Sequence, residues 1–216
     1  MTLLRDPSNQ EIVDALRPYE FGATPDFCEK TKLYINLLLR WNEKVPLTTI
    51  TSTKEILRFH FGESLFGIVA GRIEERRLAD VGSGAGFPGA PLAMALPGLQ
   101  VILIESNAKK AAFLSELKRE LLLQNLAVYR GRAESMAAEE RFDIVTARAV
   151  GEYAKLLTWA RKHLDQAGTG RTVLWLGTRQ IDEVRTHGRW EWAKPIPVPK
   201  TRGRYVLVGS LSRFEA

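Results

Sequence analysis

The chain has 216 residues, 45% of them hydrophobic, which suits one medium domain with a buried core and a small extension. The sequence contains no apolar run of roughly 18 residues, so no membrane span is expected. Its first ten residues also lack the apolar core of a signal peptide, and we expect a cytoplasmic protein. A single cysteine, Cys28, excludes an internal disulfide and a cysteine-based zinc site, and we predict no metal site.

The net charge of +6 is distributed unevenly along the chain. Residues 1–149 hold 19 Lys and Arg against 19 Asp and Glu, whereas residues 150–216 hold 12 against 6. A basic C-terminal third could attract a polyanion such as RNA, or it could simply keep the protein soluble. Charge alone leaves both interpretations open.

The first 75 residues are predicted to be mostly helical. Apolar side chains recur at helical spacing over residues 26–42, so one face of that helix should be buried. A shorter helix is expected around residues 11–16. Pro46 interrupts the pattern, and a helix is again expected over residues 54–69.

After residue 76, short apolar strands alternate with helices. Strands are expected at residues 78–81, 100–105, 127–129, 142–147, 172–176 and 205–209, and helices at residues 88–96, 107–124 and 152–164. Repeated βα units predict an α/β fold with a doubly wound, mostly parallel sheet. We therefore predict an N-terminal helical extension over residues 1–75 and an α/β domain over residues 76–216, packed as one compact unit.

A glycine-rich loop follows the first predicted strand, where residues 80–89 read DVGSGAGFPG. Its first three glycines are Gly82, Gly84 and Gly86. Glycines between a strand and a helix N-terminus allow a sharp turn and a close approach to a ligand. Phe87 stands where the G-x-G-x-x-G dinucleotide fingerprint has its third glycine, and Asp80 would repel a pyrophosphate. Asp80 suits a ligand with a cationic amine and a sulfonium, so the loop predicts S-adenosylmethionine as cofactor rather than a nicotinamide.

Further candidates follow the next two strands, because open α/β sheets bind ligands beyond the carboxyl ends of their strands. Glu105 ends the second strand, 23 residues after Gly82. An acid at this spacing can accept hydrogen bonds from ribose hydroxyls, although it could also be a solvated strand end. Ala133 and Glu134 follow the third strand, where an adenine would be held, and a helix-capping role for Glu134 stays open.

Arg148 follows the fourth strand, at the place that faces the transferred methyl group in such folds. An ion pair with Asp143 or Glu152 is the structural alternative. The segment has no Asp/Asn-Pro-Pro-aromatic motif for an exocyclic amine, no cysteine to add to a pyrimidine and no nearby histidine suited as a base. These absences favour an acceptor with a free lone pair, such as guanine N7, for which Arg148 would position the reactants and no general base is needed.

Several segments together resemble the RsmG (GidB) family over about residues 30–180. They are residues 80–89, Glu105-Ser106 with residues 109–114, residues 132–134 and 142–150, and upstream residues 34–42, Leu47-Thr48 and residues 60–65. The resemblance implies a class I S-adenosylmethionine-dependent methyltransferase with a Rossmann-like sheet. It also implies methylation of N7 of a guanosine in 16S ribosomal RNA, with that RNA or the small ribosomal subunit as partner.

The resemblance also implies which residues contact S-adenosylmethionine. They are Gly82, Phe87, Ala133, Glu134 and Arg148. The physical arguments above add four more, namely Asp80, Gly84, Gly86 and Glu105. The N-terminal helices are implied to form a lid or an RNA-facing subdomain.

Two positions depart from the family pattern. The family usually has Asp where Glu63 stands, and Lys where Leu176 stands after the fifth strand. A basic residue facing the RNA is therefore lost, or replaced by Arg179. The change at Leu176 motivates a rival interpretation, a non-catalytic RNA-binding ribosome-assembly factor on the same fold.

The last predicted strand is preceded by a stretch rich in proline and basic residues. Arg202 and Arg204 preserve the basic residue that the family has there, and Lys200 lies in the same stretch. The stretch is either a loop that clamps RNA or a surface crossover. Its charge argues against a methyltransferase for small molecules, and a monomer is the default expectation.

Overall fold

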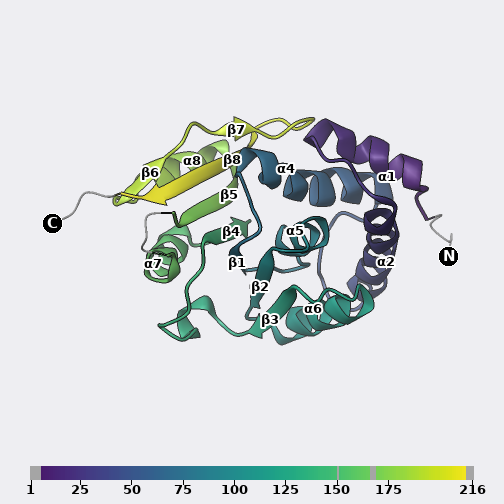
Figure 1. Ribbon diagram of the computed structural model, residues 1–216, viewed down its shortest axis with the longest axis horizontal. Helices are drawn as coiled ribbons and strands as arrows, with labels where there is room; N and C mark the ends of the chain where they lie inside the picture. The colour runs from purple at the N-terminus through teal and green to yellow at the C-terminus, as the bar shows by residue number, and fades with distance from the viewer. Residues whose placement is uncertain (1–5, 150, 166–168, 213–216) are drawn as a thin grey trace.

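The computed structural model describes residues 6–149, 151–165 and 169–212 and contains an eight-stranded sheet (Figure 1). The strand order is β3-β2-β1-β4-β5-β8-β6, and β7 also pairs with β8. The first five strands of that order run parallel, whereas β8 is antiparallel to its neighbours β5, β6 and β7. The strands are β1 (Arg77–Val81), β2 (Gln100–Glu105), β3 (Leu126–Arg130), β4 (Ile144–Arg148), β5 (Arg171–Gly177), β6 (Trp190–Trp192), β7 (Ile196–Pro197) and β8 (Arg204–Leu211).

Helices cover both faces of this sheet, as a doubly wound fold requires (Figure 1). One face carries α4 (Glu63–Ala70), α5 (Gly89–Ala95) and α6 (Ala108–Glu120), and the other carries α7 (Tyr153–His163) and α8 (Thr178–Arg185). The N-terminal helices α1 and α2 pack outside the first set. The remaining helical segments are α1 (Asn9–Leu16), η1 (Arg17–Tyr19), α2 (Pro25–Asn42), α3 (Thr53–Glu55), η2 (Ile56–Gly62) and η3 (Ala133–Ser135).

The buried side chains form two clusters, one on each face of the sheet. The first cluster joins Ile12 of α1, Tyr34 of α2 and Phe61 to Leu92 and Phe113 of the helices on the sheet. The N-terminal helices therefore share a core with the sheet. The division at residue 75 stays a prediction.

Most predicted elements are confirmed, with ends displaced by a few residues. The helix expected over residues 54–69 is instead three segments, because η2 in its middle is a π-helix. A side chain at Gly62 would collide with the ring of Tyr19, so the close contact there requires glycine. The prediction also missed α8, β6 and β7. β7 lies within the basic stretch and pairs with β8, and Lys200 and Arg202 lie between the two strands.

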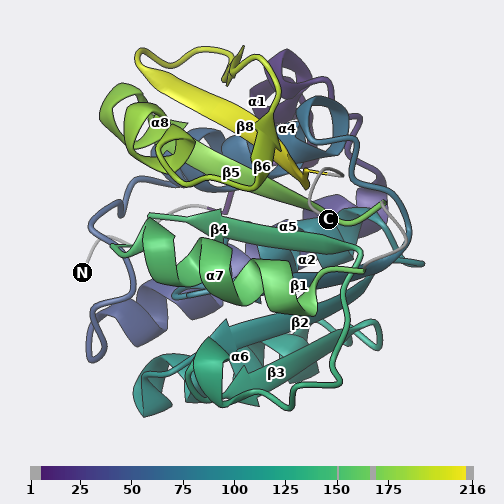
Figure 2. The same cartoon turned by 90° about the vertical axis from the view of Figure 1, so that its left-hand side faces the viewer.

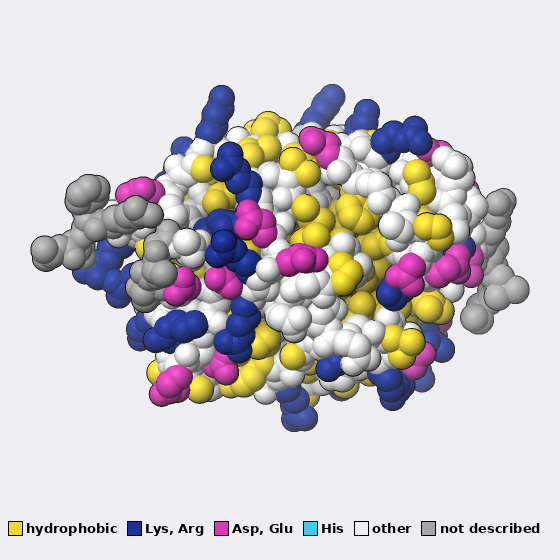
Figure 3. Space-filling model, viewed as in Figure 1, with side chains coloured by type: hydrophobic (Ala, Val, Ile, Leu, Met, Phe, Trp, Pro, Cys, Tyr) yellow, Lys and Arg dark blue, Asp and Glu magenta, His cyan; other side chains and the backbone are white. Residues whose placement is uncertain are grey.

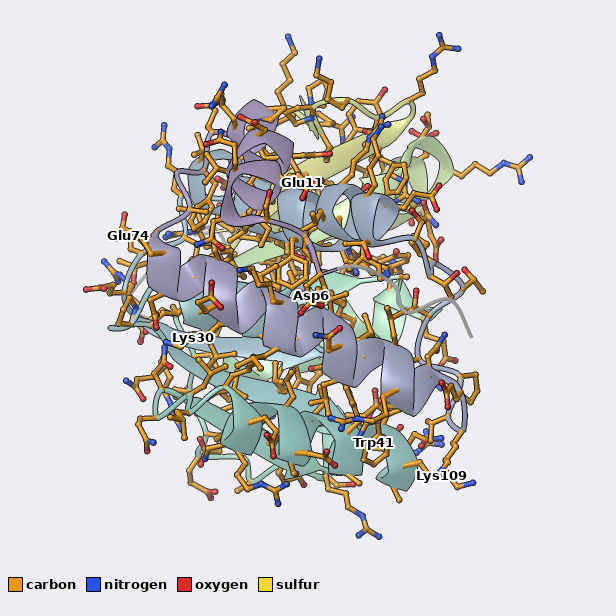
Figure 4. The ribbon with its side chains drawn as sticks, turned by 90° about the vertical axis from the view of Figure 1, so that its right-hand side faces the viewer. Asp6, Glu11, Lys30, Trp41, Glu74 and Lys109 are labelled. Atoms are coloured by element: carbon orange, nitrogen blue, oxygen red, sulfur yellow. The ribbon has the colours of Figure 1, made fainter. Side chains whose placement is uncertain are left out.

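The parallel strands all end at one edge of the sheet. In Figure 2 the arrows of β2, β3 and β4 point to the left and that of β8 to the right. The view in Figures 1 and 3 is therefore of the opposite edge, where apolar surface near the middle is surrounded by both acidic and basic side chains. Figure 4 shows the same polarity, with Glu74 before β1 on the left and Lys109 after β2 on the right.

Among the described residues, no helix is long and apolar enough to cross a membrane. Over the same residues, no group of three or more His, Cys, Asp or Glu side chains is placed to hold a metal ion.

We predict that Gly67→Ala destabilises the protein, because a Cβ there would overlap the indole of Trp175. Overpacking of this kind costs about 1–3 kcal/mol, more than the gain of up to about 1 kcal/mol in helix propensity. Urea titration should show a lower free energy of unfolding. Gly22→Ala is the control, since nothing lies within 4 Å of its added Cβ. Equal losses in both variants would contradict the packing argument.

Candidate cofactor and acceptor sites

The glycine loop has the backbone geometry of a close ligand cradle. Gly82, Gly84 and Gly86 have φ angles of 71°, 56° and 91°, which side chains rarely adopt. The N–H groups of Gly82 and Ser83 donate to the carbonyl of Ile104, at 2.9 and 3.2 Å, and so hold the loop against β2. A Cβ on Gly84 would meet only the Gly82 carbonyl, at 3.8 Å, so this side of the loop is open.

Gly86 serves packing rather than an open ligand face. It is buried, and its added Cβ would lie 2.5 Å from the Tyr34 hydroxyl. That hydroxyl donates a 2.6 Å hydrogen bond to the Ala85 carbonyl. Tyr34 of α2 therefore holds the loop from the side of the N-terminal helices.

Asp80 lies beneath the loop, fully buried. Its Oδ2 accepts from the Gly89 N–H at 3.2 Å, and its Oδ1 accepts from the Thr146 hydroxyl at 2.9 Å. Burial raises the pKa of Asp80 to about 6, although these hydrogen bonds act in the opposite direction. The carboxyl ties the start of α5 to β4, and its direct contact with a cofactor stays a prediction.

Glu105 is 7% exposed and supports the loop through both carboxylate oxygens. Oε2 accepts from the Gly84 N–H at 2.8 Å and Oε1 from the Asn107 N–H at 2.7 Å. This burial is unlike a solvated strand end. Each oxygen keeps a second lone pair, so the carboxylate can still accept from a ribose hydroxyl.

A small cavity of about 150 Å³ lies at the carboxyl ends of β1, β2 and β3. It brings together Gly82, Ala133 and Glu134 of the predicted set, with Ile104 and Ser106 beside them. The turn at Gly82, the small side chain of Ala133 and the hydrogen-bonded carboxylate of Glu105 nearby suit a nucleoside. These residues fit the S-adenosylmethionine that the loop predicts.

Phe87 is 4% exposed and lies in a buried aromatic cluster at the end of the glycine loop. The ring of Tyr34 stacks on it at a centroid distance of 5.0 Å, and that of His60 at 4.6 Å. The Arg148 guanidinium carbon lies 5.3 Å from its centroid. Phe87 therefore joins the loop to the N-terminal helices and to β4.

Arg148, the last residue of β4, is held by three acceptors. Nη1 donates to the Phe59 carbonyl at 2.8 Å and lies 3.8 Å from Glu63 Oε2, and Nη2 is 3.2 Å from His60 Nδ1. The alternative ion pairs with Asp143 and Glu152 are wrong. Asp143 instead pairs with Arg76, and Glu152 pairs with Lys155.

His60 is neutral, and its tautomer follows from its partners. A guanidinium can only donate, so Nδ1 accepts from Arg148 and the ring proton is on Nε2. Nε2 then donates to the Thr48 hydroxyl at 2.8 Å. Burial, with Arg148 and Arg204 nearby, lowers the pKa of His60 to about 3. Both nitrogens are occupied, so His60 has none free to act as a base.

Glu63 is 1% exposed and links the two arginines. Arg204 Nη1 donates to both of its carboxylate oxygens, at 2.8 and 2.9 Å. Burial raises the pKa of Glu63, while Arg148 and Arg204 lower it. Trp175 Nε1 donates to its backbone carbonyl at 2.6 Å, so the start of α4 is tied to β5.

A larger cavity of about 460 Å³ lies at the carboxyl ends of β4 and β5. Glu63 is the only acid among its lining residues, and Arg148, Arg202 and Arg204 are the cations. Its size and depth suit a nucleobase with part of its sugar. The cavity is also lined by Ile50, Phe59, Tyr153, Trp175, Leu176, Gln180 and Val198.

The four predicted RNA-binding residues divide into two groups. Arg202 and Arg204 line the larger cavity, whereas Arg179 and Lys200 are exposed and do not line it. Phe59, Tyr153 and Gln180 also line this cavity and were not among the residues predicted from the sequence. The position of Phe59 next to His60 was the one signal that could have indicated it.

We predict that Asp80→Asn removes part of the pH dependence of stability. Because the folded pKa of about 6 exceeds the usual value of 3.8, the folded state binds the proton more tightly. Asp80 therefore lowers the stability as pH rises from about 4 to 6, by about 1.4 kcal/mol per pKa unit. Urea titrations from pH 4 to 8 should show a flatter profile for the variant. Asp182→Asn, exposed on α8, should keep the wild-type profile, and an unchanged slope in Asp80→Asn would refute the assignment.

Comparison with known proteins agrees with this geometry. The family model for rRNA small subunit methyltransferase G (GidB) matches residues 27–195. A relative of that name from Desulfitobacterium hafniense (strain Y51) is 39% identical over 168 residues, 75% of this chain and 70% of the relative. Another from Xylella fastidiosa (strain 9a5c) is 38% identical over 178 residues, 81% of this chain and 82% of the relative.

Solved structures share the fold at low sequence identity. The glycopeptide N-methyltransferase MtfA complexed with (S)-adenosyl-L-methionine superposes with a TM-score of 0.59 and 14% identity, over 72% of this chain and 88% of its own. The ribosomal protein L11 methylase from Lactobacillus delbrueckii subsp. bulgaricus gives a TM-score of 0.58 and 14% identity, over 72% and 80%. The fold is that of class I methyltransferases, and the chain belongs to the rRNA small subunit methyltransferase G family.

Proposed function

We propose that this methyltransferase uses S-adenosylmethionine to methylate N7 of a guanosine in 16S ribosomal RNA. One observation carries the choice of acceptor atom. Among the residues that the structure describes, one histidine and one acid line the larger cavity: His60 has both ring nitrogens occupied, and Glu63 is bound to Arg204. An acceptor that must lose a proton would find no base there, whereas guanine N7 has a free lone pair.

The names of the relatives support the RNA substrate. Both relatives described above are named ribosomal RNA small subunit methyltransferase G. The cations of the larger cavity agree with a polyanionic substrate, because three arginines face a single carboxylate. The proposal further includes a monomer that acts in the cytoplasm.

S-adenosylmethionine supplies a methyl group bound to a positively charged sulfur. The N7 lone pair forms the new bond to that carbon, the carbon–sulfur bond breaks, and its electron pair stays on sulfur. No proton moves, so the rate depends on alignment. The part of Arg148 is to position the reactants. Its guanidinium is fixed by Phe59 and His60 at the end of β4, where it lines the larger cavity.

The predicted cofactor residues form two groups, those that would contact the cofactor and those that would support the loop from below. Gly82, Gly84, Ala133 and Glu134 would contact the cofactor, with Glu105 accepting from the ribose. Asp80, Gly86 and Phe87 would act from beneath, because all three are buried and shape the loop.

The N-terminal helical extension over residues 1–75 would form one wall of the RNA site. The larger cavity is lined by Ile50, Phe59, His60 and Glu63 from this part of the chain. A role in facing the RNA agrees with this placement better than a detached lid, because the same helices share the core of the sheet.

The first test is transfer of a labelled methyl group to undermethylated small ribosomal subunits and to their naked RNA, followed by nucleoside analysis. We expect the label in 7-methylguanosine. Label in another nucleoside would overturn the choice of acceptor. No label, with cofactor and RNA both bound, would favour the non-catalytic assembly factor.

We further predict that the exposed cations near the larger cavity contact phosphates. Replacing Lys200 and Arg202 together by Ala should weaken RNA binding and reduce the slope of log affinity against log salt by up to about 2. Lys118 and Arg119, in the last turn of α6 at the opposite edge, provide a matched control pair. Filter binding at several salt concentrations measures the RNA affinity and the salt slope of both double variants. An unaltered slope in the first pair would exclude phosphate contacts.

A further inference from the structure

The π-helical segment leaves one aromatic side chain partly exposed. Ile56, Leu57 and Phe61 of η2 are 0%, 3% and 0% exposed, whereas Phe59 is half-buried and lines the larger cavity. A single exposed aromatic residue is common on protein surfaces. Phe59 differs from such a residue because it contacts Arg148, Arg58 and Arg204.

The surroundings of Phe59 fix its position relative to the proposed reaction centre. Its carbonyl accepts the 2.8 Å hydrogen bond from Arg148, the residue proposed to align the reactants. Its ring lies near two guanidiniums, whose carbons are 4.8 Å from the centroid for Arg58 and 5.6 Å for Arg204. Flat cationic groups and nucleobases use the same aromatic faces. Arg58 is exposed, so its guanidinium can leave the ring and move to a phosphate.

One wall of the cavity is apolar, the largely buried pair Glu63 and Arg148 lines another part of it, and exposed arginines form its rim. Leu176, Trp175 and Val198 are 4%, 5% and 2% exposed and form apolar walls. Arg202, in the loop before β8, and Arg204, the first residue of β8, are exposed. This division suits a nucleotide, whose base is flat with apolar faces and whose phosphate is anionic.

The acceptor atom itself requires such a pocket. In a paired A-form helix, N7 faces a deep and narrow groove that side chains cannot enter. A guanine that reaches a cofactor in a protein cavity is therefore unpaired and removed from its stack. An aromatic ring replaces the lost stacking and holds the base in one plane.

We propose that Phe59 is the stacking platform for the target guanine, with its phosphates held by the arginines at the rim. This inference rests on the proposed function, because it takes an unpaired RNA base as the acceptor. It adds a residue that contacts the substrate and assigns the apolar wall of the cavity, Leu176 included, to the base rather than to the RNA backbone.

The test compares Phe59→Leu, which keeps apolar bulk but loses the aromatic face, with Phe59→Trp, which keeps it. Phe21→Leu is the matched control, a half-buried phenylalanine that contacts Phe27 and does not line the cavity. The measurements are affinity for undermethylated 16S RNA at several salt concentrations, kcat and KM for methyl transfer, and affinity for S-adenosylmethionine.

We expect Phe59→Leu to weaken RNA binding and kcat/KM by about 5- to 100-fold. The salt slope and the cofactor affinity should stay at wild-type values, because no phosphate contact is lost and the fold is kept. Phe59→Trp should restore binding. Equal behaviour of Phe59→Leu and Phe21→Leu would overturn the proposal. If the wild type bound RNA but transferred no methyl group, a loss of RNA affinity confined to Phe59→Leu would still support the platform while the proposed function failed.

Discussion

The buried stacking around Phe87 is the contact on which the rest of the site depends. Tyr34 of α2 and His60 of η2 stack on this ring, and the guanidinium of Arg148 lies over it. Three separate parts of the chain thus meet at one residue of the glycine loop. Neither the loop nor the N-terminal helices can shift without breaking this cluster, so the cofactor cavity and the larger cavity keep a fixed geometry relative to each other.

The charge on Arg148 explains why the site has no general base. A buried guanidinium needs acceptors, because an unpaired buried charge costs several kcal/mol. The protein supplies the Phe59 carbonyl, the His60 Nδ1 and, at 3.8 Å, the Glu63 carboxylate. Among the described residues, His60 is the histidine that lines the cavity. Its hydrogen bond with Arg148 keeps it neutral and leaves Nδ1 unable to accept a proton from a substrate. Acceptors that carry a free lone pair are the ones that such a site can serve.

Local patterns predicted the elements well, and long-range pairings could not be predicted. The continuous apolar run of residues 100–105 and the glycine loop identified β2 and the cofactor edge. The predicted ion-pair partners of Arg148 were wrong. Sequence proximity suggested Asp143 and Glu152, whereas the observed partner His60 is 88 residues away. Arg204 and Glu63 are 141 residues apart.

Short or weakly patterned elements were missed for a related reason. In α8 only Ile181 and Val184 are buried, so the apolar repeat is too sparse to indicate a helix, and the start of α8 depends on a hydrogen bond from the Gly177 N–H to the Gln180 side chain. The π-helical segment η2 ends at Gly62, which packs against Tyr19 more than 40 residues away, a contact that no local pattern shows. The orientation of the Asp80 side chain likewise depends on a hydrogen bond from Thr146, which is 66 residues away in the sequence.

The leucine at position 176 fits this charge arrangement. Leu176 is 4% exposed and lines the larger cavity, where Arg148, Arg202 and Arg204 already face a single carboxylate. A lysine there would add a fourth cation that has to lose its water without a free acid to pair with. Methylation at N7 also leaves a positive charge on the base, which a further cation would repel. An apolar wall at Leu176 avoids both costs, which agrees with the proposed contact of the base with aromatic and apolar side chains.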